Sequence, residues 1–175
     1  MSAEKNEATL KDLFNNLGPG LDRWMDAYRR CLTPECAWYM QGWPTVNGID
    51  ELGYQLQMLN ALMGANANPI LEWRKIHNYG DKIIFERKGS FADVNGKTIT
   101  DWDICGIFSF NAAGKICEIR DYFDNTGPYA KLKGVIPDEQ IAMINKLAVN
   151  PLATGYKADT TFYKRMCEQM AAVMA

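Results

Sequence analysis

Arg87 and Asp121 are the two residues whose types and predicted positions could support acid–base chemistry. A carboxylate can accept a proton, and a guanidinium beside it can orient it and stabilise its charge. Both residues fall in apolar runs, where a charge is costly to bury unless it is paired. The pair is either a structural salt bridge in the core or a catalytic aspartate that an arginine orients at the bottom of an apolar pocket. We favour the catalytic interpretation, because perturbed ionisable groups gather at functional sites.

The elements that must position this pair lie within residues 82–124. Three apolar-rich runs are separated there by two turn signals, an Asn-Gly pair and the segment 111–114, which is the pattern of a three-stranded antiparallel meander. A two-residue loop at the Asn-Gly pair places Arg87 opposite Ile104. A four-residue loop at the second signal places Ile104 opposite Asp121. The three side chains are then predicted to lie in one line on one face of the sheet.

One face of this meander is predicted to be aromatic and apolar, and the other to be charged. Because side chains alternate along a strand, the face that carries the pair also carries Phe85, Phe91, Trp102, Phe108, Ile119 and Phe123. The opposite face carries Glu86, Lys88, Asp101, Asp103, Glu118 and Arg120. The pair is therefore expected to lie on the concave, apolar face of a curved sheet.

The composition predicts one globular domain, because 175 residues that are 47% hydrophobic can bury a sizeable core. The net charge of −2 and the absence of a basic run argue against nucleic acid as a partner. No apolar segment approaches the ~20 residues needed to span a bilayer, so we expect no membrane association. The five cysteines have no metal-like spacing, and we interpret them as reduced thiols of a cytoplasmic protein. We also expect no cofactor and no metal, since no phosphate-binding loop or ligand cluster is present.

The remaining elements predict an α+β cone, in which a curved, mostly antiparallel sheet wraps around N-terminal helices. The periodicity and the breaking residues predict helices at 4–17, 21–32, 49–63 and 137–147, strands at 36–40 and 70–77, and a final helix that Asp159 caps. In the strand 70–77, either Leu71 and Trp73 or their neighbours face inward, and the apolar choice is favoured. We divide the chain into a cone domain with a ligand pocket, 1–130, and a helical extension, 131–175.

The order of these elements, with the Glu-Arg pair at 86–87 and the run IRDYFD at 119–124, resembles the nuclear transport factor 2 superfamily. The resemblance covers residues 10–130 and is closest to its limonene-epoxide-hydrolase-like and polyketide-cyclase-like members. It implies that Arg87 and Asp121 match the arginine and the basic aspartate of that hydrolase family. The sequence departs from the family at three places: Gly89 stands where a proton-donating aspartate is expected, and Trp38 and Met40 stand where two residues hold the attacking water.

These departures imply chemistry without a bound water, for which the superfamily offers isomerases, dehydratases, cyclases and diarylpropane lyases. We therefore expect a cofactor-independent lyase that acts on a bulky aromatic molecule, by elimination or by a retro-aldol step such as deformylation of a lignin-derived diaryl compound. The alternatives are an epoxide hydrolase of the limonene-epoxide type and a non-catalytic small-molecule binder. The candidate substrate-binding residues are Trp38, Tyr39, Met40, Met58, Phe85, Gly89, Phe91, Trp102, Ile104 and Phe123. Tyr39, Tyr129 and Tyr156 could each supply the missing acid.

Two surfaces are expected to contact more than solvent. The outer face of the sheet carries apolar residues among its charges, Ile84, Cys105, Ile107 and Tyr122, and we expect it to bury itself in a homodimer. The extension 131–175 is rich in apolar residues, which must be buried either over the mouth of the cone, as a lid, or against a partner subunit.

Overall fold

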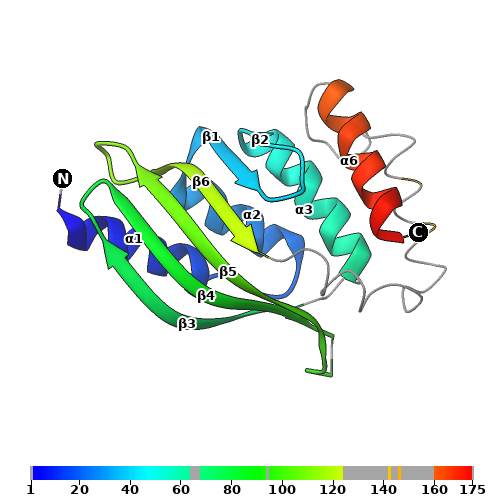
Figure 1. Ribbon diagram of the computed structural model, residues 1–175, viewed down its shortest axis with the longest axis horizontal. Coiled ribbons are helices and arrows are strands. Elements are labelled where there is room, and N and C mark those ends of the chain that lie inside the picture. The colour runs from blue at the N-terminus through cyan, green and yellow to red at the C-terminus, as the bar shows by residue number, and fades with distance from the viewer. Residues whose placement is uncertain are drawn as a thin grey trace.

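A computed structural model describes residues 2–63, 68–93, 95–123 and 160–174, together with the single positions 142 and 146. The described elements form an α+β fold in which N-terminal helices fill a curved sheet (Figure 1). Their order is α1 Ala3–Asn15, α2 Leu21–Cys31, β1 Leu32–Met40, β2 Val46–Asn47, α3 Ile49–Met63, β3 Asn68–Asn78, β4 Lys82–Ala92, β5 Thr98–Phe110, β6 Ile116–Phe123 and α6 Thr160–Met174. The predicted fold class is confirmed.

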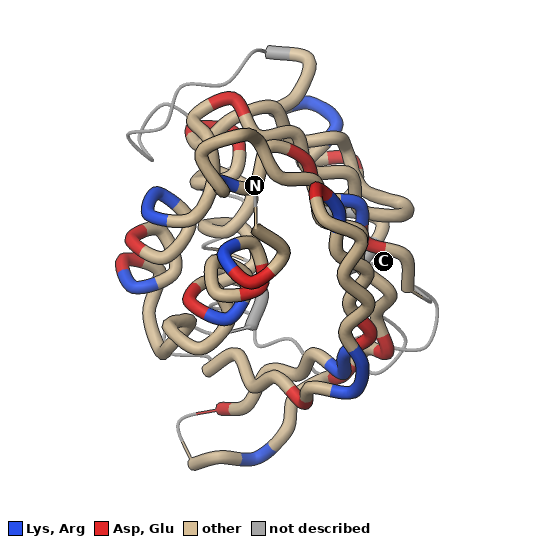
Figure 2. Tube along the Cα trace, turned by 90° about the vertical axis from the view of Figure 1, so that its left-hand side faces the viewer, with Lys and Arg blue, Asp and Glu red and all other residues tan. Residues whose placement is uncertain are grey.

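Six strands make one open sheet in the order β2-β1-β6-β5-β4-β3. The long strands β3 to β6 form the predicted antiparallel meander, and β1 joins its far side by pairing parallel to β6. Figure 2 looks nearly along α1 and shows the strands curving around this helix. The concave face is therefore the inside of the molecule, and side chains on alternate positions of each strand point toward the helices.

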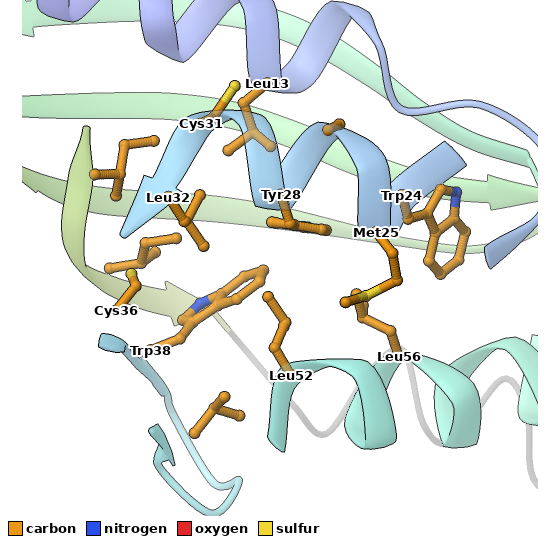
Figure 3. Packing of buried hydrophobic residues seen from close by; sticks show 14 of the residues in the cluster. Leu13, Trp24, Met25, Tyr28, Cys31, Leu32, Cys36, Trp38, Leu52 and Leu56 are labelled. Carbon is orange, nitrogen blue, oxygen red and sulfur yellow. The ribbon is translucent and has the colours of Figure 1, made fainter. Parts of the chain in front are cut away.

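The N-terminal helices supply the apolar layer that the concave face buries. Leu10 and Leu13 of α1 are fully buried, and α2 contributes Trp24, Met25 and Tyr28. Figure 3 shows the α2 side chains pointing toward Trp38 of β1 and toward Leu52 and Leu56 of α3. The helix α2 thus lies between the sheet and α3, as its predicted apolar stripe requires.

The C-terminal helix α6 packs on α3, on the side away from the sheet (Figure 1). Phe162 and Met166 of α6 are buried, and the Phe162 ring meets Tyr54 of α3 edge-on, with centroids 6.3 Å apart. The predicted helix 137–147 and the Asp159 cap fall outside the described residues, apart from positions 142 and 146. Among the described helices, none has both the length and the apolar character that a bilayer span requires.

The prediction that Leu71 and Trp73 of β3 face inward is confirmed, and a bulge keeps the apolar side chains of this strand on the inner face. Leu71 and Trp73 pack against the core, the register shifts between Trp73 and Lys75, and Ile76 then faces inward. The bulge turns Arg74 outward, where its guanidinium lies 2.8 Å from the carboxylate of Asp103. An extra residue thus lets the strand bend without exposing its apolar side.

The two hairpins of the meander share one turn, which differs from both predicted loops. Each turn has the pattern Asx-x-x-Gly-Lys, at 93–97 and at 111–115. The carboxylate of Asp93 and the amide oxygen of Asn111 accept hydrogen bonds from backbone N–H groups two and four residues later, at 2.9–3.0 Å. The glycines at the fourth position, Gly96 and Gly114, have φ of +80° and +76°, which favours glycine.

The shared turn corrects the predicted register at one hairpin and not at the other. Each turn is followed by a one-residue bulge, after residue 98 in β5 and after residue 116 in β6. At the first hairpin the register shift caused by the turn and the register shift caused by the bulge cancel, so Arg87 does face Ile104. At the second they add, so the prediction that Ile104 faces Asp121 is wrong: Ile104 faces Phe123, and Asp121 faces Gly106. A shift of two residues keeps Asp121 on the concave face.

Candidate active site

Arg87 of β4 and Asp121 of β6 form an ion pair inside the cone. The guanidinium Nη2 lies 2.7 Å from Oδ1 of Asp121, and each side chain is 3% exposed. The strand β5 runs between them, and the residue of β5 opposite Asp121 is Gly106. A Cβ at Gly106 would lie 2.6 Å from the same carboxylate oxygen and against the guanidinium. The pair therefore occupies the space that a side chain at Gly106 would otherwise fill.

The second oxygen of Asp121 is held by Trp38 of β1. The indole Nε1 donates a hydrogen bond of 3.1 Å to Oδ2. The position that resembled a water-holding site therefore carries a group that binds the aspartate directly. Two donors on two strands fix the carboxylate plane, and they fill two of the roughly four lone-pair directions of the carboxylate.

Three aromatic rings enclose the guanidinium of Arg87. Its Cζ lies 5.0 Å from the ring centroid of Phe14 and 5.5 Å from those of Phe85 and Phe108. These distances are within the range of cation–π attraction. Nη1 has no hydrogen-bond partner in the described part of the chain, so the rings and Asp121 are what stabilise this buried charge. The Arg87 side chain is consequently held in a single place beside Asp121.

The ion pair forms part of the wall of an apolar cavity of about 160 Å³. Residues from α1, α2, α3 and all the strands except β2 contribute to it. Of the residues predicted to bind substrate, the cavity is lined by Trp38, Met40, Gly89, Phe91, Trp102, Ile104 and Phe123. Its size is close to that of an engineered protein cavity that holds benzene, so it has room for one aromatic ring.

Three of the predicted substrate-binding residues do not line this cavity. Tyr39 lies on the outer face, 38% exposed, with its ring 5.9 Å from that of Tyr122. Met58 is fully buried in α3, and Phe85 lies beneath Arg87 as part of its aromatic enclosure. Tyr39 faces outward because side chains alternate along a strand and its neighbour Trp38 faces inward. The possible acids Tyr129 and Tyr156 are outside the described residues.

Helices, loops and the strands β3 and β4 supply further cavity residues that the sequence did not indicate as binding residues. Besides the predicted residues, the lining contains Phe14, Leu17, Trp24, Tyr28, Trp43, Leu56, Leu59, Pro69, Ile70, Leu71 and Ser90. Several of them belong to apolar stripes that periodicity alone assigns to the core. The signal that could have distinguished them is the pair of large aromatic residues one helical turn apart in α2, Trp24 and Tyr28, whose rings pack against Phe91 and Trp38 of the sheet.

Tyr28 is a polar residue of this group that contacts Trp38, the donor that holds Asp121. It is 4% exposed, lines the cavity, and packs its ring 5.6 Å from that of Trp38 (Figure 3). Burial, followed by the charge of Asp121, raises the pKa of the Tyr28 phenol above its usual range. The hydroxyl group therefore stays protonated at neutral pH.

Metal-ligating side chains do not gather into a site in the described chain. Within residues 2–63, 68–93, 95–123 and 160–174, no group of three or more His, Cys, Asp or Glu side chains could hold a metal ion. All five cysteines are free thiols, as predicted. None of the described side chains of α6 lines the cavity, and the last described residue of the lining is Phe123.

Comparison with known proteins identifies the fold. No protein-family model matches the sequence, and no curated protein matches it. An LEH-like epoxide hydrolase from M. tuberculosis matches over 85% of this chain and 97% of its own, with a TM-score of 0.57 and 17% identity. A putative SnoaL-like polyketide cyclase from Jannaschia sp. CCS1 matches over 69% and 86%, with a TM-score of 0.53 and 19% identity. An NTF2-like protein from Burkholderia pseudomallei matches over 71% and 92%, with a TM-score of 0.56 and 17% identity.

The chain has the cone fold of the NTF2-like proteins. Identities below 20% show the fold alone, and many unrelated activities share such a fold. The function must therefore be argued from the cavity and from the residues that line it.

Proposed function

We propose that this protein is a cofactor-independent acid–base enzyme, a lyase that acts on an aromatic small molecule, with Asp121 as the base. The observation that carries the proposal is the position of Asp121, whose carboxylate Arg87 and Trp38 hold in the wall of an apolar cavity. A purely structural ion pair needs neither a cavity beside it nor a second donor from another strand. A base needs both a fixed carboxylate and space for the group that it deprotonates.

The surroundings suit proton transfer in two respects. The cavity wall is almost wholly apolar, so a bound aromatic molecule would displace water and leave few competing proton donors. Each carboxylate oxygen keeps a free lone-pair direction after its bond to Arg87 or Trp38. Asp121 is therefore able to accept a proton without first breaking the contacts that position it.

A retro-aldol cleavage illustrates the step we propose. Asp121 takes the proton of a substrate hydroxyl group, and the O–H electron pair becomes the second bond of a new carbonyl group. The adjacent C–C bond breaks, and its electron pair moves into a neighbouring carbonyl group to give an enolate. The enolate carbon then takes the proton back from Asp121. One molecule becomes two carbonyl compounds, and the base returns to its carboxylate form.

The size of the cavity limits what can be enclosed. A volume of about 160 Å³ has room for one ring. A diaryl substrate would therefore place one ring between residues such as Phe91 and Trp102, whose rings meet edge-on at 5.9 Å, and its second ring toward the mouth. Gly89 faces Trp102 across the strands, and a Cβ there would come within 3.1 Å of the Ile104 side chain, so glycine keeps this part of the wall clear.

Epoxide hydrolysis is less compatible with these contacts. It requires a water molecule held against the base and an acid for the epoxide oxygen. Here Trp38 donates directly to the base, Met40 offers no hydrogen-bond donor, and Gly89 has no side chain to act as the acid. A binder that performs no reaction has no use for an aspartate fixed by two donors at the cavity wall.

The experiment is a screen of aromatic β-hydroxy ketones, diols, enones and epoxides in ¹⁸O-labelled water, followed by mass spectrometry. We expect cleavage or elimination products that carry no label beyond the carbonyl exchange seen when each product is incubated alone. One labelled hydroxyl group at carbon would establish hydrolysis instead. Binding of several compounds without any product would establish a binder.

A further inference from the structure

The geometry points to Tyr28 as the residue that donates a hydrogen bond to an oxygen atom of the bound substrate. This inference rests on the proposed function, because it assigns the electrophilic partner of the base. Tyr28 thereby takes the role of the acid that Gly89 cannot supply, and it does so from a helix rather than from the sheet. The substrate class is thereby narrowed to aromatic compounds with a carbonyl oxygen next to the bond that breaks.

The first observation is the position of Tyr28 in the cavity wall. Its side chain is buried between α2 and the sheet, lines the same cavity as Asp121, and contacts the ring of Trp38 (Figure 3). Trp38 in turn donates to Asp121. The phenol therefore lies one residue away from the base, on the side of the cavity that α2 covers.

The second observation is that no hydrogen bond joins the Tyr28 hydroxyl group to any residue in the described part of the chain. The hydroxyl group is not one of the polar atoms that are both unpaired and sealed from solvent, so it opens into the cavity that Tyr28 lines, and polar groups inside native proteins are normally paired. Tyr54 shows the usual arrangement: its buried hydroxyl lies 3.9 Å from the Cys167 thiol. An oxygen atom of a ligand in this cavity can therefore accept the hydrogen bond that Tyr28 does not make within the protein.

The third observation is that several other donors in the cavity wall already have oxygen partners in the protein. Trp38 donates to Asp121 through Nε1 and Arg87 through Nη2, while Nη1 of Arg87 is unpaired but has almost no accessible surface. Trp24 Nε1 donates to a carbonyl oxygen of the loop before α2, and the Ser90 hydroxyl lies 3.5 Å from a carbonyl oxygen of β3. A substrate oxygen that turned to one of these paired donors would have to break an existing bond.

Tyr28 acts as a donor rather than as a second base, because its raised pKa keeps the proton on the phenol. In the retro-aldol step above, negative charge develops on the oxygen of the carbonyl group that receives the electrons. A donor placed before the reaction stabilises that charge without reorganisation. Asp121 and Tyr28 would then face the two polar ends of the substrate, and the aromatic wall would hold its ring.

The test compares acetophenone with α-methylstyrene, which has nearly the same shape but a methylene group in place of the carbonyl oxygen. NMR titration of the wild-type protein should show tighter binding of acetophenone, by about three- to tenfold, the range of one net hydrogen bond. Tyr28→Phe should bind both compounds equally. Tyr54→Phe is the matched control, because it removes a buried hydroxyl that does not line the cavity, and it should keep the wild-type preference. Equal preference in the wild type and Tyr28→Phe would overturn the inference.

A measurement on the wild-type protein makes the test independent of variant folding. The carbonyl stretching frequency of bound, ¹³C-labelled acetophenone should be lower than in hexane, because a hydrogen bond weakens the C=O bond. An unshifted frequency would overturn the inference. Neither measurement needs turnover, so failure here leaves the role of Asp121 standing, and failure of the Asp121 assignment leaves this hydrogen bond measurable.

Discussion

Arg87 reaches Asp121 across a strand that has no side chain at the crossing point. The nitrogen and the oxygen are 2.7 Å apart, and the intervening residue, Gly106, faces Asp121 directly. The backbone of Gly106 does not require glycine, since its φ is not positive. The glycine is needed because a Cβ would collide with both members of the pair. The requirement at Gly106 is therefore one of space.

We expect Gly106→Ala to destabilise the protein by about 2–4 kcal/mol, because the methyl group must separate a buried ion pair or displace the strand. Gly89→Ala is the matched control on the neighbouring strand. Its Cβ would meet only the end of the Ile104 side chain, at 3.1 Å, which can move. Urea unfolding measures both changes. Equal, small effects of the two substitutions would show that the pair does not occupy the space at Gly106.

Arg87 and Asp121 should be strongly coupled in stability. Arg87→Met and Asp121→Asn each leave one buried partner without its counterpart, at about 3–5 kcal/mol. The double variant removes both, so we expect it to cost less than the sum by roughly 2 kcal/mol. The exposed pair Arg74 and Asp103 is the control cycle, with an expected coupling below ~1 kcal/mol. Additive effects at the buried pair would contradict the account of Arg87 as a charge that Asp121 stabilises.

Much of this arrangement follows from alternation along the strands, and the rest depends on local turn geometry. Alternation places Arg87, Asp121 and Trp102 on one face, as the structure confirms. The contact of Arg87 with Asp121 across Gly106 could not be derived, because it depends on how a one-residue bulge adds to the register shift of the turn at 111–115. An Asx residue four positions before a lysine and three before a glycine is a turn signal that sequence reasoning could have used at both hairpins.

Contacts between elements that are far apart in the sequence were the hardest to predict. Trp38 was predicted to line the pocket, but its bond to Asp121 depends on the parallel pairing of β1 with β6, which periodicity does not indicate. Tyr28 belongs to a helical stripe that reads as ordinary core. Its place beside the ion pair is set by how α2 sits on the sheet, and only the packed structure determines that.

The buried thiols predict a loss of stability in alkali. Burial is the main cause that raises the pKa of Cys31 and of Cys36 to about 12. The unfolded chain loses these protons near pH 8.5, so in the window up to about pH 12 the folded state binds more protons and stability falls as pH rises. Each thiol contributes a slope of about 1.4 kcal/mol per pH unit.

Cys36→Ala should reduce that slope by about 1.4 kcal/mol per pH unit, the contribution of one thiol, between roughly pH 9 and 11. Urea unfolding under reducing conditions measures this change. Cys105→Ala, at an exposed position, should leave the slope unchanged. If both variants retain the wild-type slope, the Cys36 thiol is not protected from ionisation by the fold.

The outer face of the sheet remains the predicted homodimer surface. Tyr39 and Tyr122 lie side by side there, 38% and 40% exposed, among charged side chains. We expect Tyr122→Glu to shift the protein toward the monomer in sedimentation equilibrium, because it places a charge within an apolar contact. Tyr79→Glu, at the exposed turn between β3 and β4, is the control. A wild-type protein that stays monomeric at micromolar concentration would contradict the prediction of a homodimer.

The central claim is that Asp121 is a base, and turnover by Asp121→Asn tests it most directly. The amide keeps the shape of the side chain but cannot take the proton. The assay uses a substrate identified by the screen, at a temperature where circular dichroism shows that the variant is folded. Asp103→Asn, on the outer face, controls for the change of charge. We predict that kcat falls by at least about a hundredfold in Asp121→Asn and is unchanged in Asp103→Asn. A folded Asp121→Asn protein that turns over at close to the wild-type rate would contradict the claim.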